Sequence, residues 1–126
     1  MADFAELKAL AASLAHERAL PGGGSCASVA AAIEAASGRV YTGVCIDVAC
    51  SMGFCAEHAA IAAMVTAGET RVRRVVAVYE DGRVVAPCGR CREFLYQIDH
   101  GNLGAEVLLG SGVSTLEGLL PHIWTE

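Results

Sequence analysis

The chain has 126 residues, a length that fits one domain with a substantial buried core, so we expect a single domain over 1–126. Its formal net charge of -5 argues against binding to a nucleic-acid polymer, which requires clustered Lys and Arg. No apolar run approaches the ~18 residues that span a bilayer, and acidic residues occupy the N-terminal segment where a signal peptide carries basic ones. We therefore expect no membrane partner, a cytoplasmic location and a small-molecule substrate.

Apolar periodicity and turn residues predict the elements in chain order. An amphipathic helix over 2–20 ends at Pro21 and the glycines after it. Two antiparallel strands joined by a tight turn come next, then a helix that is apolar nearly all round and is therefore expected to be internal. Pro87 stands where the first turn of a further helix favours proline. The expected helices are 2–20, 55–67, 88–98 and 116–120, and the expected strands are 28–35, 39–47, 74–79, 84–86 and 106–109.

Alternating helices and apolar strands predict an α/β fold, a three-layer α/β/α sandwich with helices on both faces of a mixed sheet. The composition is 54% hydrophobic but only 6% aromatic, so the core should consist of small, closely packed side chains. The glycine run 22–24 lacks the preceding strand of a phosphate-binding loop. We interpret it as a linker that borders the mouth of a pocket.

Cys55, Cys88 and Cys91 are the candidate metal ligands. Six cysteines could indicate disulfides, but nothing in the sequence points to an oxidising compartment. Cys91 follows Cys88 by about one helical turn, and the strand between the two helices can bring both helix N-termini to one point. A catalytic zinc site keeps three protein ligands, which leaves the fourth position for water. We therefore predict one catalytic Zn²⁺.

Glu57 is the candidate catalytic residue because it lies two residues beyond Cys55, where its carboxylate can reach zinc-activated water without binding the metal. It would take a proton from the water and pass protons to a ring nitrogen and a departing amine. Three thiolates leave a zinc site negatively charged, which makes it a poor activator of water. Two helix N-termini and Arg90 are the predicted electrostatic support.

His58 supports an alternative interpretation, in which the zinc site is structural and the chain is not an enzyme. Cys55-x-x-His58 together with Cys88-x-x-Cys91 would give four ligands, and a closed four-ligand zinc is structural and catalytically inert. The chain would then be a non-catalytic, zinc-stabilised scaffold. Glu57 and Pro87 argue against this alternative, since a closed site requires neither.

Cys55-Ala56-Glu57 and Pro87-Cys88-Gly89-Arg90-Cys91 resemble the metal motif of the cytidine deaminase superfamily, in particular the branch of small tetrameric cytidine deaminases and blasticidin S deaminase. The likeness runs from about Ser25 to Trp124 and includes 28–32, 38–44 and 119–121. It implies a five-stranded mixed sheet and a zinc-dependent aminohydrolase that releases ammonia from a cytosine-type nucleoside or base. It also implies a homotetramer in which Trp124 helps to close the pocket of a neighbouring subunit.

The predicted substrate-binding positions depart from the pattern of that family. Cys45 and Asp47 stand where the family typically has Asn and Glu to hold the ribose hydroxyls, and Ala27 stands where an aromatic usually packs on the pyrimidine. Cysteine cannot make the paired hydrogen bonds of Asn, and Ala removes a stacking surface. A modified cytosine nucleoside such as blasticidin S, or another small amino-heterocycle such as a purine, is therefore the alternative to cytidine.

Two further observations concern the region around the motif. His58 stands where cytidine deaminases typically have Arg after the catalytic Glu, and the blasticidin-type members resemble this chain in having the equivalent of Arg90 instead. Cys26, Cys45 and Cys50 lie in or beside apolar strands, where a thiol behaves as a small buried hydrophobe.

Overall fold

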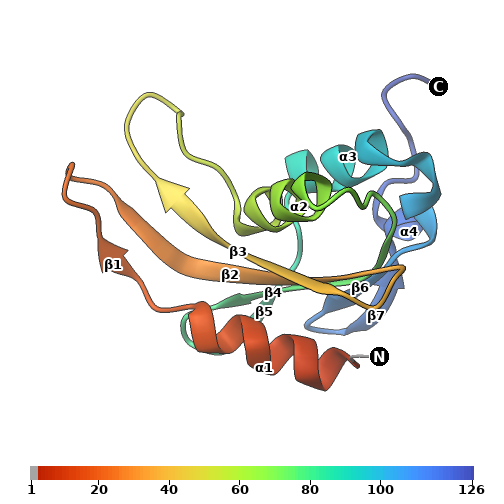
Figure 1. Cartoon of the computed structure of the whole chain (residues 1–126). Coiled ribbons are helices and arrows are strands. Elements are labelled where there is room, and N and C mark those ends of the chain that lie inside the picture. The colour runs from red at the N-terminus through yellow and green to blue at the C-terminus, as the bar shows by residue number, and fades with distance from the viewer. Residues whose placement is uncertain (1–2) are drawn as a thin grey trace.

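The computed structural model describes residues 3–126 (Figure 1). The start of the predicted first helix, at Ala2, lies outside the described residues. In chain order the elements are α1 (Phe4–Leu14), β1 (Arg18–Ala19), β2 (Ser25–Ala35), β3 (Val40–Asp47), α2 (Ala56–Thr66), β4 (Val72–Tyr79), β5 (Val84–Val85), α3 (Gly89–Ile98), the 3₁₀ helix η1 (His100–Gly104), β6 (Glu106–Leu109), β7 (Gly112–Thr115) and α4 (Leu116–Leu119).

The strands form one mixed sheet with β2 and β4 at its centre. β2 pairs antiparallel with β1, β3 and β4, while β4 pairs antiparallel with β5 and parallel with β6, which pairs with β7. The sheet has seven strands rather than the expected five. β1 and β5 are only two residues long, so the sheet consists of five longer strands and two short additions.

Helices cover both faces of this sheet, as predicted: α1 lies on one face, and α2 and α3 lie on the other (Figure 1). The central strand β2 contributes to both cores by alternation of its side chains. Ala31, Ile33 and Ala35 pack in the core beneath α2 and α3, whereas Ala30 and Ala32 pack against α1. Alanines on both faces of the strand let the helices approach the sheet closely.

Gly43 marks the closest approach of α2 to the sheet. A Cβ atom at this position would lie 2.5 Å from the Cβ of Ala59, 2.5 Å from the backbone nitrogen of Ala60 and 2.8 Å from the carbonyl oxygen of Ala56. Helix α2 therefore rests directly on the backbone of β3. This contact sets the height of α2 above the sheet and, with it, the position of the residues at the N-terminus of that helix.

The first predicted helix was too long. α1 ends at Leu14, and the polypeptide then forms β1, whose Arg18 and Ala19 pair with Cys26 and Ser25 of β2. The turn over 22–24 closes this hairpin, with the Leu20 N–H donating to the Gly24 carbonyl. β7 and η1 were not predicted.

Three local predictions near the site also need correction. α3 begins at Gly89 with Cys88 as its N-cap, so Pro87 precedes the cap rather than occupying the first turn. α2 is internal on one side only, because Ala60, Ile61 and Met64 are buried. Its opposite side is exposed, including Val65 at 42%. Cys50 is exposed in the loop before α2, whereas Cys26 and Cys45 are buried as expected.

We expect Gly43→Ala to lower the free energy of unfolding by about 1–3 kcal/mol, because the added methyl must push α2 away from β3. Gly104→Ala is the control, since a Cβ at Gly104 meets nothing within 4 Å. Urea unfolding of both variants measures the difference. Equal stability of Gly43→Ala and the wild type would show that α2 does not rest on the β3 backbone.

Candidate active site

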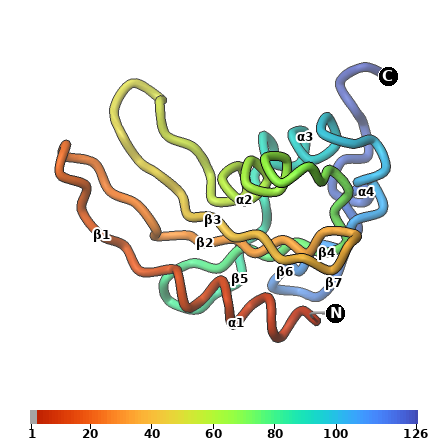
Figure 2. The backbone as a smooth tube through the Cα atoms, in the orientation of Figure 1, coloured from red at the N-terminus to blue at the C-terminus, as the bar shows by residue number. Residues whose placement is uncertain are grey.

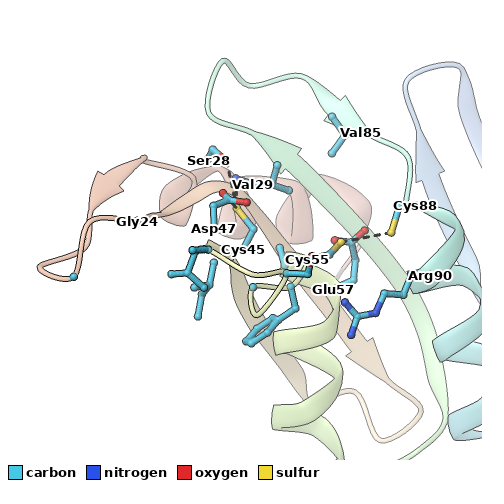
Figure 3. A pocket seen from close by; sticks show the side chains of 18 of the residues that line it. Gly24, Ser28, Val29, Cys45, Asp47, Cys55, Glu57, Val85, Cys88 and Arg90 are labelled. Carbon is cyan, nitrogen blue, oxygen red and sulfur yellow. Dashed lines mark hydrogen bonds between the residues drawn. The ribbon is translucent and has the colours of Figure 1, made fainter.

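A cavity of about 910 Å³ opens at the N-terminal ends of α2 and α3. Cys55, Glu57, Cys88 and Arg90 line one side of it, and Ser28, Val29, Cys45 and Asp47 line the other (Figure 3). The turn over 22–24 also lines the cavity, as predicted. This turn and the loop between β3 and α2 extend beyond the helices at the same end of the molecule (Figure 2).

Three thiols converge at this end of the two helices: Cys55 and Cys88 line the cavity, and the buried Cys91 lies beside them. Cys55 and Cys88 are the N-caps of α2 and α3, and Cys91 lies in the first turn of α3. The Cys88 sulfur lies 3.5 Å from that of Cys55 and 3.4 Å from that of Cys91. Two sulfurs bound tetrahedrally to one zinc at 2.3 Å stand about 3.8 Å apart. The three thiols are therefore spaced as ligands of a single zinc ion.

The ends of the two helices make this cluster suitable for thiolates. Burial raises the pKa of the Cys88 thiol, but hydrogen bonds from the backbone N–H of Cys91 and from the neighbouring thiols outweigh burial, and the net pKa is lowered. Burial raises the pKa values of Cys55 and Cys91. Zinc binds thiolates, so metal binding would release the protons of these thiols, and the two helix N-termini favour the resulting negative charge.

Glu57 is the buried carboxylate of the cavity. It lies in the first turn of α2, is 4% exposed, and lines the same cavity as Cys55 and Cys88. Burial raises its pKa, while hydrogen bonds from its own backbone N–H and from Cys91 act in the opposite direction. A raised pKa makes the Glu57 carboxylate a stronger base, which suits a group that must accept a proton and pass it on.

His58 stands beside the thiols without joining their cluster. Within residues 3–126, a group of ligand atoms lying within 4.8 Å of one another comprises Cys55, Cys88 and Cys91 only. The Nδ1 atom of His58 lies 3.2 Å from the Cys91 sulfur, and its ring stacks on Phe94. This arrangement does not favour the closed four-ligand site that the sequence left open.

Arg90, the predicted electrostatic support, is an exposed side chain at the edge of the cavity. Its positive charge adds to burial in lowering the pKa of His58. The guanidinium is therefore near enough to act on the metal side of the cavity through its charge.

The wall opposite the thiols centres on Cys45. Its sulfur accepts a hydrogen bond from the Val29 N–H at 3.3 Å and lies 3.3 Å from the Ser28 hydroxyl. The Cys45 thiol also donates a long hydrogen bond of 3.9 Å to Asp47. Asp47 is itself exposed to the cavity, so its carboxylate is the charged group of this wall.

The remaining predicted substrate positions lie outside the cavity lining of the described chain. Ala27 is fully buried, with a left-handed φ of 69°, in an irregular stretch of β2. Trp124 is 72% exposed.

Conversely, Ser28 and Phe54 line the cavity and were not singled out from the sequence. Phe54 immediately precedes Cys55, and its position next to a metal ligand could have identified it as a cavity residue.

The chain is similar to cytidine deaminases in sequence and in structure. Residues 5–104 match the family described as "Cytidine and deoxycytidylate deaminase zinc-binding region". The cytidine deaminase of Mycobacterium tuberculosis is 37% identical over 97 residues, which cover 75% of this chain and 70% of that protein. The crystal structure of cytidine deaminase from Mycobacterium leprae has a TM-score of 0.82 and 30% identity, covering 97% of this chain and 100% of the other. The corresponding Mycobacterium tuberculosis structure also has a TM-score of 0.82 and 30% identity, covering 98% of each chain.

An α/β scaffold that gathers three thiols beside a buried carboxylate at the edge of a cavity, together with these relatives, defines a zinc-dependent aminohydrolase. More narrowly, the chain belongs to the cytidine and deoxycytidylate deaminase family, which confirms the resemblance noted in its sequence. Zinc is its cofactor, and Cys55, Cys88 and Cys91 form a cluster able to hold that ion. None of the helices within residues 3–126 is long and apolar enough to cross a membrane.

We expect the chain to bind one zinc ion, and Cys88→Ser to weaken zinc binding by at least about 100-fold, the upper end of what outer-shell changes cost. Cys50→Ser is the matched control, because Cys50 is exposed and outside the cluster. Competition with a chromogenic chelator measures both affinities. Unchanged affinity in Cys88→Ser, or equal losses in the two variants, would contradict the assignment.

The raised pKa of Glu57 predicts that the metal-free chain loses folding stability as the pH rises. The folded state holds the Glu57 proton more tightly than the unfolded state, in which the carboxyl titrates near its ordinary value of 4.5. Stability is therefore lost as the pH rises from that value through the raised pKa. Glu57→Gln avoids this loss, so its advantage over the wild type in thermal unfolding should grow as the pH rises above 4.5 and level off once the pH exceeds the raised pKa. The exposed Glu6→Gln is the control, and a pH-independent difference would contradict the prediction.

Proposed function

We propose that this chain hydrolyses the exocyclic C–N bond of a cytosine nucleoside and releases ammonia, with Glu57 as the proton carrier. The observation that supports this most strongly is the position of a buried carboxylate beside three thiols, at helix N-termini, on a cavity of about 910 Å³ that is large enough for a nucleoside. The names of the relatives, all cytidine deaminases, favour this substrate over another amino-heterocycle and over the non-catalytic scaffold.

The proposed reaction adds water across the C–N bond. Zinc held by Cys55, Cys88 and Cys91 supplies Lewis-acid activation of water at near-neutral pH. The Glu57 carboxylate takes one proton from the attacking water and gives it to the adjacent ring nitrogen. It then carries the second water proton to the departing amino group, which leaves as ammonia while the ring carbon becomes a carbonyl. Glu57 is therefore a carboxylate again at the end of the cycle.

The opposite wall favours an uncharged sugar over a phosphorylated one. Asp47 presents a carboxylate that can accept hydrogen bonds from a sugar hydroxyl, and it would repel a phosphate. Cys45 lies beside Asp47 with its sulfur already bonded to Val29 and in contact with Ser28. We therefore assign sugar binding mainly to Asp47, with Arg90 as electrostatic support on the metal side.

We further propose that the chain acts in the cytoplasm as a homotetramer of single-domain subunits, each spanning 1–126. Apolar side chains on several elements support an assembly because they are exposed in the isolated chain: Val65 at 42%, Met52 at 77% and Trp124 at 72%. Trp124 is available to close the cavity of a neighbouring subunit. Ala27 is the residue that replaces the family's usual aromatic, so part of the pyrimidine contact would have to come from elsewhere.

We expect Glu57→Ala to retain zinc and to lower kcat for ammonia release by at least about 100-fold, the contribution typical of a general acid–base residue. Glu6→Ala, which removes an exposed acid, should leave kcat unchanged. The assay covers cytidine, deoxycytidine, deoxycytidylate, cytosine, blasticidin S and aminopurines, with cytidine or deoxycytidine expected to react fastest. A fully active Glu57→Ala would exclude this mechanism, and turnover confined to blasticidin S or aminopurines would exclude the proposed substrate.

A further inference from the structure

We infer that His58 is a positioning residue of the metal site, which donates a hydrogen bond from Nδ1 to the sulfur of Cys91 and so couples α2 to α3. The inference rests on zinc binding at the three cysteines, and it gives His58 a role distinct from that of a fourth ligand. It also assigns to His58 part of the electrostatic support that the sequence alone attributed to Arg90.

The first observation is that His58 contacts two of the three thiol-bearing residues. Its backbone N–H donates to the carbonyl oxygen of Cys55 at 3.1 Å, and its Nδ1 lies 3.2 Å from the Cys91 sulfur. Cys55 caps α2, whereas Cys91 lies in the first turn of α3. The contact with Cys55 is an ordinary backbone bond of the first turn of α2, whereas the side-chain contact with Cys91 joins α2 to α3 near the point where their thiols meet.

The direction of this hydrogen bond follows from the chemistry of the metal site. A metal-binding cysteine is a thiolate and has no proton to donate. The proton in a contact of 3.2 Å must then reside on Nδ1 of His58. Histidine thus acts as a donor to the sulfur, as outer-shell groups commonly do for metal-binding residues.

The second observation is that the His58 ring is fixed by stacking. Its centroid lies 4.3 Å from that of Phe94, with an angle of 8° between the ring planes. Phe94 follows Cys91 by three residues on α3, so both side chains lie on the same side of that helix. The stack therefore aligns the Nδ1–H bond with the sulfur of Cys91.

Cys91 is the thiol that most needs such a donor. It is fully buried, whereas Cys55 is half-buried and Cys88 is exposed, so its sulfur has the least access to hydrogen bonds from water. Arg90 is exposed, so solvent screens its charge. The hydrogen bond from His58 acts at contact distance on a buried sulfur, where it stabilises the Cys91 thiolate more effectively.

Two substitutions separate the hydrogen bond from the packing. His58→Phe keeps a ring over Phe94 but removes the donor, and His58→Asn keeps an N–H near the position of Nδ1 but removes the ring. His100→Phe is the matched control, because His100 stacks on Tyr96 in the same way, at 4.4 Å and 4°, without contacting a thiol of the cluster. Thermal unfolding checks that all three variants fold.

We expect His58→Phe to weaken zinc binding about 10–100-fold in chelator competition. In the cobalt-substituted protein it should move the sulfur-to-cobalt charge-transfer band to lower energy, because the Cys91 thiolate loses a donor. His58→Asn should keep most of the affinity and the wild-type band position, and His100→Phe should match the wild type. Wild-type affinity and band position in His58→Phe would overturn the inference, as would equal losses in His58→Phe and His58→Asn. Neither readout depends on turnover, so failure here is distinguishable from failure of the proposed deaminase.

Discussion

The contact between Gly43 and α2 is the constraint on which the site depends. Because glycine has no side chain, the backbone of α2 reaches the backbone of β3, and this fixes where the helix begins above the sheet. Cys55 and Glu57 stand at that beginning. α3 begins at the same edge of the sheet, after β4 and β5, so Cys88 and Cys91 meet Cys55 without any long flexible side chain having to reach across. A site made of three short thiol side chains tolerates little movement of either helix.

The same face of β3 forms first the floor beneath α2 and then the wall of the cavity. Side chains on alternate residues of a strand point to one face, so Gly43, Cys45 and Asp47 share the face that carries α2. The helix covers Gly43, and the strand continues past the helix end, where Cys45 and Asp47 line the cavity. The cavity therefore exists because β3 extends further than α2. Because α2 rests on β3, the distance between Glu57 on the helix and the polar wall on the strand is fixed.

Much of this site was predictable from the sequence because its key residues are local in the chain. Cys88 and Cys91 are one helical turn apart, and Glu57 is two residues from Cys55, so their spacing determines their geometry once the helices form. The sequence brought His58 to the same metal as Cys91, but the contact of its Nδ1 with the Cys91 sulfur was not predictable, because that contact depends on how α2 and α3 pack. β1 was missed because its two residues have no periodicity of their own and are strands only through pairing with Ser25 and Cys26. Ala27 could be matched from the sequence to the position of the family's aromatic. Its left-handed conformation and complete burial could not be predicted, because they arise from the irregular pairing of β2.

The balance of charge at the site restricts what can bind there. Glu57 and Asp47 place carboxyl groups on opposite sides of the cavity, and the three thiols add negative charge wherever they ionise (Figure 3). The compensating groups lie on the metal side: the N-termini of α2 and α3, the Nδ1–H of His58 and the exposed guanidinium of Arg90. They offset the thiolates, but the cavity-lining residues of the described chain place no cation on the wall of Asp47. A ligand that reaches both walls must therefore be neutral or cationic at the end that meets Asp47, which favours a nucleoside over a nucleotide.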